Sequence, residues 1–125
     1  MAIGCVLLVD DDADIRTIGS LALGDVGGWR TLLASSGQEA IELAVVERPD
    51  VVLLDVMMPE MDGPSVLVAL QGRAETSAIP VIFMTAKAQK HELSRFRSLG
   101  ATGVITKPFD PMQLAEEVRR IVEEG

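Results

Sequence analysis

The amino-acid sequence predicts an α/β protein in which helices cover both faces of one parallel sheet. Short, uninterrupted apolar runs recur along the chain, and they have the composition of strands that are buried on both faces. Segments with apolar residues at helical spacing separate these runs, so that strand and helix alternate five times. Such alternation requires parallel pairing through right-handed crossovers, which gives a doubly wound sheet of five strands with five helices. The expected strands are Cys5–Val9, Trp29–Ala34, Val51–Leu54, Val81–Met84 and Gly103–Thr106.

The helices follow from spacing and from start signals. Ser36 with Glu39 three residues later is a capping box, and Asp110 followed by Pro111 marks the start of the last helix. The third helix is expected after Gly63, and the fourth over residues 91–99. The apolar stripes of the first, second and fifth helices are Ile15, Ile18, Ala22 and Val26; Ile41, Ala44 and Val45; and Leu114, Val118, Ile121 and Val122.

Length and composition indicate one folded domain over residues 1–125 and exclude several functions. The formal net charge of −8 argues against general binding to nucleic acid or to an anionic membrane, because both need a basic surface. Cys5 is the only cysteine, so neither an intrachain disulfide nor a cysteine zinc site can form, and an inert core thiol is expected. No signal peptide or membrane-spanning run is visible, which predicts a cytoplasmic protein.

Polar residues follow four of the expected strands. In a doubly wound sheet, ligands bind at the carboxyl ends of the strands, so these residues are expected to meet at one edge. Asp12 is also a candidate for the cap of the first helix, because the apolar stripe begins just after it. The residues at this edge are Asp10, Asp11 and Asp12 after the first strand, Asp55 after the third, Thr85 after the fourth and Lys107 after the fifth.

This combination predicts a magnesium site that handles a phosphoryl group. Several carboxylates in one cleft repel one another unless a cation offsets their charge, and oxygen ligands without His or Cys favour Mg²⁺. A hydroxyl from Thr85 and an ammonium from Lys107 are suited to bind phosphoryl oxygens. Asp55, alone at the end of its strand, is the best-placed nucleophile, because aspartate can accept a phosphoryl group as a mixed anhydride.

Four motifs, "VLLVDDD", "VVLLDVMMPEMDG", "VIFMTA" and "VITKPF", resemble those of the receiver domains of two-component response regulators, and the resemblance covers essentially the whole chain. It implies a flavodoxin-like sheet with strand order 2-1-3-4-5. It also implies that Asp55 is the phospho-acceptor, that Asp11 binds Mg²⁺ directly, that Asp10 does so through water, and that the backbone carbonyl of Met57 is a further ligand.

The resemblance implies further properties of the site and its partners. Thr85 and Lys107 bind the phosphoryl group, and the Lys107–Pro108 peptide is expected to be cis. The phosphoryl donor is a phosphohistidine on a sensor histidine kinase or a histidine phosphotransfer protein. The domain is not a conventional enzyme, although it promotes its own phosphorylation and dephosphorylation. His91 is expected to be an exposed residue at a helix end and not the donor.

The sequence departs from the common pattern of the family at one position. Many members carry an aromatic residue three positions before the lysine, where this chain has Val104, so switching by rotation of an aromatic side chain is expected to be absent. Met57 and Lys87, two residues after Asp55 and Thr85, flank the phosphoryl group in the family and tune its lifetime.

Alternatives remain open from the sequence alone. Asp10 and Asp12 match the D-x-D pattern of small haloacid-dehalogenase-type phosphatases, which are Mg²⁺-dependent, although Asp14 does not fit and Asp55 would have no role. A role in transcription requires a fused effector domain that binds DNA. Homodimerisation through the fourth helix, fifth strand and fifth helix is a further expectation, with Glu116, Glu117, Arg119 and Arg120 as candidate residues.

Overall fold

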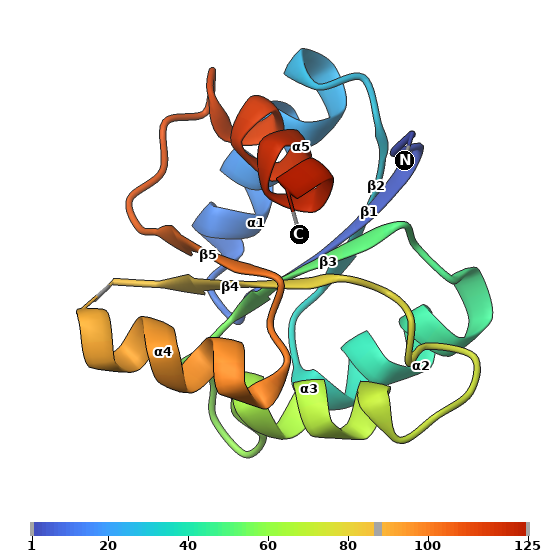
Figure 1. The fold of residues 1–125 in the computed structure, drawn as a ribbon. Helices are drawn as coiled ribbons and strands as arrows, with labels where there is room; N and C mark the ends of the chain where they lie inside the picture. Colours follow the sequence, from blue (N-terminus) through green and yellow to red (C-terminus); the bar gives the residue numbers. More distant parts are fainter. Residues whose placement is uncertain (1, 87–88, 125) are drawn as a thin grey trace.

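A five-stranded parallel sheet forms the middle layer of the molecule, with strand order β2-β1-β3-β4-β5 (Figure 1). The computed structural model describes residues 2–86 and 89–124. Helices lie on both faces of the sheet, which confirms the predicted doubly wound fold and its strand order. The elements are β1 Cys5–Val9, α1 Ala13–Ser20, the π-helix η1 Leu21–Val26, β2 Arg30–Ala34, α2 Gly37–Glu47, β3 Val51–Asp55, α3 Gly63–Gln71, β4 Val81–Thr85, α4 Lys90–Leu99, β5 Gly103–Thr106 and α5 Leu114–Glu124.

Two apolar cores lie on opposite faces of the sheet. All five residues of β3 and all five of β4 are buried, as expected for central strands of a parallel sheet. Side chains alternate between the faces, so neighbouring residues of one strand enter different cores. The core under α2, α3 and α4 includes Val52, Leu54, Phe83, Leu67 and Phe96. The core under α1, η1 and α5 includes Val51, Leu53, Met84, Leu23 and Val118.

Short polar side chains cap the first turns of α1, α2 and α3, where Asp62 is the cap of α3. Asp12 accepts a hydrogen bond from the backbone N–H of Asp14 at 2.8 Å, which confirms its expected role as a helix cap. The Oγ of Ser36 accepts from the N–H of Glu39 at 3.2 Å. The other half of the predicted capping box differs, because the Glu39 carboxylate accepts from the N–H of Ser35 at 2.6 Å and not from Ser36.

The first helical segment differs from its predicted apolar stripe. After Ser20 the chain continues as the π-helix η1, in which the N–H of Gly27 donates to the carbonyl of Ala22 five residues earlier. This spacing shifts the side chains relative to an α-helix. Within η1, Ala22 is fully buried, whereas Val26, which was predicted to face the core, is exposed. Ile18 was also predicted to face the core and is exposed, but it lies in α1, before the π-helix begins.

Two further expectations were wrong in detail. The last α-helix begins at Leu114, because the predicted start at Asp110 is a turn in which its carboxylate accepts from the N–H of Met112. Cys5 is half-buried at the start of β1 and is not a core residue, although burial still raises the pKa of its thiol. Among the described residues, no helix is both long and apolar enough to cross a membrane.

Gly63, at the start of α3, lies against the backbone that follows β3. A Cβ at this position would lie 2.7 Å from the carbonyl oxygen of Asp55 and 2.9 Å from the Cα of Val56. We therefore expect Gly63→Ala to lower the free energy of unfolding by about 2–3 kcal/mol, because backbone atoms cannot move aside as a flexible side chain can. Urea denaturation measures this change.

Gly72, at the other end of α3, supplies the matched control. A Cβ there would meet only ordinary contacts, the closest at 3.6 Å from the carbonyl oxygen of Val68, and the backbone of Gly72 is right-handed. Gly72→Ala is expected to leave stability unchanged or slightly raised. Equal stabilities of the two variants would contradict the proposed clash at Gly63.

Candidate phosphoryl-acceptor and metal site

The acidic residues meet where the winding of the sheet changes direction. β1 and β3 are neighbours at the centre of the sheet, and the chain leaves them toward opposite sides. Asp10 and Asp11 directly follow β1, and Asp55 is the last residue of β3. By the alternation of side chains, Asp55 lies on the same face of β3 as Leu53, which is the face covered by α1 and α5.

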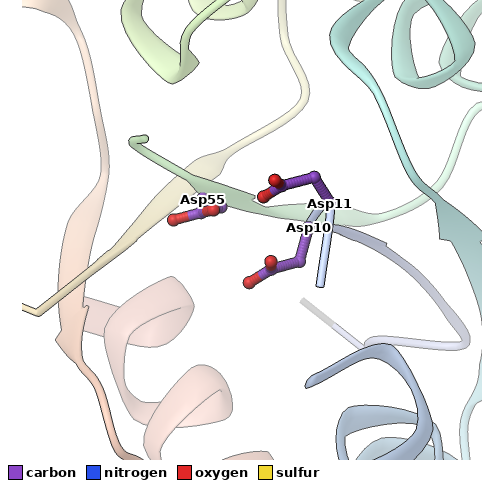
Figure 2. A group of neighbouring side chains, drawn as sticks. All are labelled: Asp10, Asp11 and Asp55. Atoms are coloured by element: carbon purple, nitrogen blue, oxygen red, sulfur yellow. The ribbon is translucent and has the colours of Figure 1, made fainter. Parts of the chain in front are cut away.

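Asp10, Asp11 and Asp55 form a cluster of carboxylates at this edge (Figure 2). One oxygen from each lies within 4.8 Å of the others, so one ion could contact all three. Asp10 and Asp55 are buried, with exposures of 1% and 5%, whereas Asp11 is exposed. The cluster therefore consists of two buried carboxylates and one that is exposed to solvent.

Lys107 brings a positive charge into the cluster from the end of β5. Its Nζ lies 2.8 Å from Oδ2 of Asp10 and 3.0 Å from Oδ1 of Asp55, and its side chain is 20% exposed. The Lys107–Pro108 peptide is cis, as expected from the resemblance. The backbone N–H of Lys107 donates to the carbonyl of Thr85 at 2.8 Å, which joins the ends of β4 and β5.

Burial and neighbouring charges shift the pKa values of Asp55 and Lys107. Burial raises the pKa of Asp55 above its usual value, and the charge of Asp10 adds to this effect, while the hydrogen bond from Lys107 opposes it. Burial alone lowers the pKa of Lys107, but its hydrogen bonds to Asp10 and Asp55 outweigh burial and leave the pKa raised. Lys107 therefore stays charged, and its ammonium offsets the repulsion between the two carboxylates.

Two more of the predicted site residues, Thr85 and Met57, lie close to Asp55 along the neighbouring strand or in the following loop. Thr85 is buried at the end of β4, the strand next to β3. Met57 follows Asp55 in the loop, with its N–H 3.4 Å from Oδ1 of Asp55 and its side chain 78% exposed. Lys87 lies outside the described residues. His91 is exposed at the start of α4, as expected.

Comparison with known proteins identifies the family. A family model described as the response regulator receiver domain matches residues 6–119. The chain belongs to this family. As a receiver domain it carries its acidic cluster at the carboxyl ends of the sheet, and the structure confirms the fold that the motifs implied.

Solved structures and curated relatives agree with this assignment. The receiver domain is similar to the chemotaxis protein CheY4 of Vibrio cholerae, with 32% identity, a TM-score of 0.89 and coverage of 96% of this chain and 99% of that one. It is also similar to the signal receiver domain of a histidine kinase from Syntrophus aciditrophicus, with 32% identity, a TM-score of 0.82 and coverage of 97% and 91%. The transcriptional regulatory protein PhoP of Bacillus subtilis is 35% identical over 94% of this chain and 48% of that protein. The receiver domain spans about half the length of the curated relatives it matches.

The phosphatase alternative is not supported. It requires the carboxylates of Asp10 and Asp12 to act together on a substrate. In the structure the Asp12 carboxylate caps α1, and the Asp10 carboxylate is paired with Lys107. The family match also places the chain among receiver domains.

Sequence reasoning overlooked two residues that contact the backbone of this site. Gly63 packs against the carbonyl of Asp55, and Arg16 of α1 donates to the carbonyl of Asp10. The signal for Gly63 was a glycine at the start of a helix just after the acidic strand. Arg16 left no comparable signal, since it is simply the first basic residue after the aspartates at positions 10, 11, 12 and 14.

Proposed function

We propose that Asp55 accepts a phosphoryl group from a phosphohistidine on a histidine kinase or a histidine phosphotransfer protein. The observation that carries this proposal is the buried Asp55 carboxylate at the end of β3, 3.0 Å from the Lys107 ammonium and beside two further carboxylates. In the transfer, an oxygen of Asp55 bonds to phosphorus as the phosphorus–nitrogen bond of the phosphohistidine breaks. The electron pair remains on the imidazole nitrogen, which takes up a proton, and Asp55 becomes a mixed anhydride.

The donor set fits Mg²⁺. The cluster consists of carboxylates, and hard oxygen ligands of this kind suit Mg²⁺, which usually keeps several waters. We assign the ion to Asp10, Asp11 and Asp55 together with the backbone carbonyl of Met57, with Asp10 acting through water. When bound, Mg²⁺ supplies positive charge that offsets the charge of the phosphoryl oxygens.

Lys107 and Thr85 are assigned to the phosphoryl group. The Lys107 ammonium already lies between two carboxylates, so it is positioned to pair with an oxygen of a group attached to Asp55. Thr85, buried on the strand next to Asp55, would donate its hydroxyl to another phosphoryl oxygen. Both residues therefore contribute positioning and charge, while Asp55 forms the covalent bond.

An aromatic pair behind Thr85 offers a route for the signal. Thr85 and Phe83 share one face of β4, and the Phe83 ring packs edge-to-face on Phe96 of α4 with centroids 4.8 Å apart. Val104 is the partner of Phe83 in the register of β4 and β5. A shift of Thr85 would therefore reach α4 through Phe83 and Phe96 without rotation of an aromatic side chain on β5. Amide hydrogen exchange of α4, β5 and α5 with and without beryllofluoride tests this route.

We also propose that residues 1–125 form a single receiver domain. It promotes its own phosphorylation and dephosphorylation and turns over no separate substrate. Its output would reach either a separate partner or a fused effector domain, as the transcriptional regulators among its relatives suggest. With a net charge of −8, the domain itself is not expected to contact nucleic acid or membranes. A cytoplasmic location remains a prediction.

Homodimerisation through α4, β5 and α5 also remains a prediction. Arg119 of α5 already pairs with Glu116 in its own helix at 2.7 Å, and its guanidinium lies 5.2 Å from the centroid of the buried Trp29 ring. These contacts leave Glu117 and Arg120 as the better candidates for salt bridges between subunits. Sedimentation with and without beryllofluoride measures the oligomeric state.

Acetyl phosphate provides a direct test of the proposed chemistry. The protein is incubated with acetyl phosphate and Mg²⁺, and the modified residue is mapped by mass spectrometry. We expect one phosphoryl group, on Asp55, and no modification when EDTA removes the metal. Modification of another aspartate, or steady turnover of a general phosphomonoester such as p-nitrophenyl phosphate, would contradict the proposal.

The exposed side chain of Met57 is expected to slow hydrolysis of the phosphoryl group. It lies two residues beyond Asp55, and a long apolar side chain there hinders the approach of water. We expect Met57→Asn to accelerate dephosphorylation by roughly threefold to tenfold, which corresponds to at most about 1.4 kcal/mol of barrier. The decay of phosphorylated protein after removal of acetyl phosphate measures the rate.

Met112→Asn is the matched control for Met57→Asn. Met112 is also strongly exposed, at 67% against 78% for Met57, and it lies in the turn before α5. We expect this substitution to leave the dephosphorylation rate unchanged. Similar acceleration in both variants would show that the effect is not specific to position 57.

A further inference from the structure

Arg16 on α1 donates a hydrogen bond to the backbone of the acidic loop. Its Nη1 lies 2.8 Å from the carbonyl oxygen of Asp10, and its side chain is half-buried. Aspartates at positions 10, 11, 12 and 14 all precede it closely in the sequence. Nevertheless, over residues 2–86 and 89–124, no carboxylate lies within salt-bridge distance of Arg16. The guanidinium is therefore used to fix the backbone and not to pair with an acid.

The peptide group that Arg16 holds joins the two acidic residues that follow β1. The Asp10 carboxylate is fixed separately, because Oδ1 accepts from the N–H of Asp12 at 2.9 Å and Oδ2 accepts from Lys107 at 2.8 Å. The Asp11 carboxylate is exposed, and no described residue forms a hydrogen bond or an ion pair with it. The direction of Asp11 is therefore set by the backbone, which the bond from Arg16 to the preceding carbonyl restrains.

We propose that Arg16 is a positioning residue for the metal site, and that it holds the peptide between Asp10 and Asp11 so that the Asp11 carboxylate faces Asp55. The inference rests on the proposed function, because it assumes that Mg²⁺ binds to these carboxylates. Arg16 acts through Asp11 and touches neither the metal nor the phosphoryl group. Groups that orient metal ligands in this way typically change metal affinity by about 10- to 100-fold.

Calorimetric titration of Mg²⁺ into the wild type and Arg16→Gln tests the inference. We expect the dissociation constant for Mg²⁺ to rise roughly tenfold in the variant, the low end of the range for such groups. An effect of charge alone has the opposite sign, because removing a positive charge beside three carboxylates strengthens cation binding. Arg73→Gln, an exposed residue beyond the far end of α3, removes the same charge and is expected to leave Mg²⁺ binding unchanged.

A second readout separates positioning from chemistry. In phosphorylation by acetyl phosphate, Arg16→Gln should need more Mg²⁺ for half-maximal rate, yet reach the wild-type rate when Mg²⁺ saturates. Circular dichroism checks that the half-exposed substitution on α1 leaves the protein folded. Mg²⁺ binding by Arg16→Gln that is as tight as the wild type, or tighter, would overturn the inference and leave the proposed function intact. Absence of Mg²⁺ binding in the wild type would overturn the proposed metal site itself.

Discussion

Asp55→Asn is expected to lose phosphorylation by acetyl phosphate by at least about 100-fold while remaining fully folded. An amide has no anionic oxygen to attack phosphorus, so the covalent step fails. Stability should be unchanged or higher at neutral pH. Because burial raises the pKa of Asp55 in the folded protein, the protonated carboxyl stabilises the fold below the pKa of the unfolded state, and this stabilisation is lost as the pH rises through the pKa of the folded state. Mass spectrometry and urea denaturation measure the two effects.

Asp12→Asn is the matched control for this experiment. It removes a carboxylate of the same acidic region, but asparagine caps a helix about as well as aspartate, so α1 should keep its start. We expect normal phosphorylation of this variant. Phosphorylation that persists in Asp55→Asn, or disappears in Asp12→Asn, would reassign the acceptor.

Lys107→Met should destabilise the protein by leaving two buried carboxylates without their shared positive charge. The expected loss is about 2–4 kcal/mol at pH 7, somewhat less than for a fully buried pair because the Lys107 side chain is 20% exposed. The deficit should shrink as the pH falls. The pKa of Asp55 is already raised in the folded state, so protonation of Asp55 favours the folded form. The loss of stability in Lys107→Met should therefore decrease as the pH falls toward the usual aspartate pKa of about 4.

Urea denaturation at pH 7 and pH 5, with and without Mg²⁺, measures this dependence. Mg²⁺ should restore part of the stability of Lys107→Met, because it binds the folded cluster and replaces the missing positive charge. Lys90→Met, an exposed substitution at the start of α4, should change stability by less than about 0.5 kcal/mol. A loss in Lys107→Met that is the same at both pH values and with Mg²⁺ would indicate lost packing and not lost charge.

The sheet and the location of the site could be predicted because both depend on strong, local signals. A strand such as Val51–Asp55, which is buried at every residue, needs an almost continuous run of apolar residues. Parallel pairing then brings the carboxyl ends of all the strands to one edge of the sheet. The cluster of Asp10, Asp11 and Asp55 and the approach of Lys107 follow from that topology.

Other features depend on tertiary contacts that leave little trace in a single sequence. The residues of the π-helix η1 have the pattern of an ordinary helix. The one sign of a different geometry is Gly27, where a Cβ would lie 2.8 Å from the Cβ of Ala115 on α5. The start of α5 was predicted too early, because the Asp110–Pro111 turn contains the same residue types as a helix start. The contact from Arg16 to a backbone carbonyl has no sequence pattern, since it depends on where a long side chain points.

The position of Trp29 determines what the intrinsic fluorescence of the protein can report. It is the only tryptophan in a chain without tyrosine, and it is buried just before β2 with the Arg119 guanidinium above its ring. β2 runs from Trp29 toward the acidic edge over five residues, a length of roughly 16 Å. Tryptophan fluorescence therefore reports the packing of α5 on the sheet. It can be used to follow unfolding, because a ligand bound at the acidic edge does not contact Trp29. Any change in its emission on phosphorylation would have to travel through the fold, from one edge of the sheet to the other.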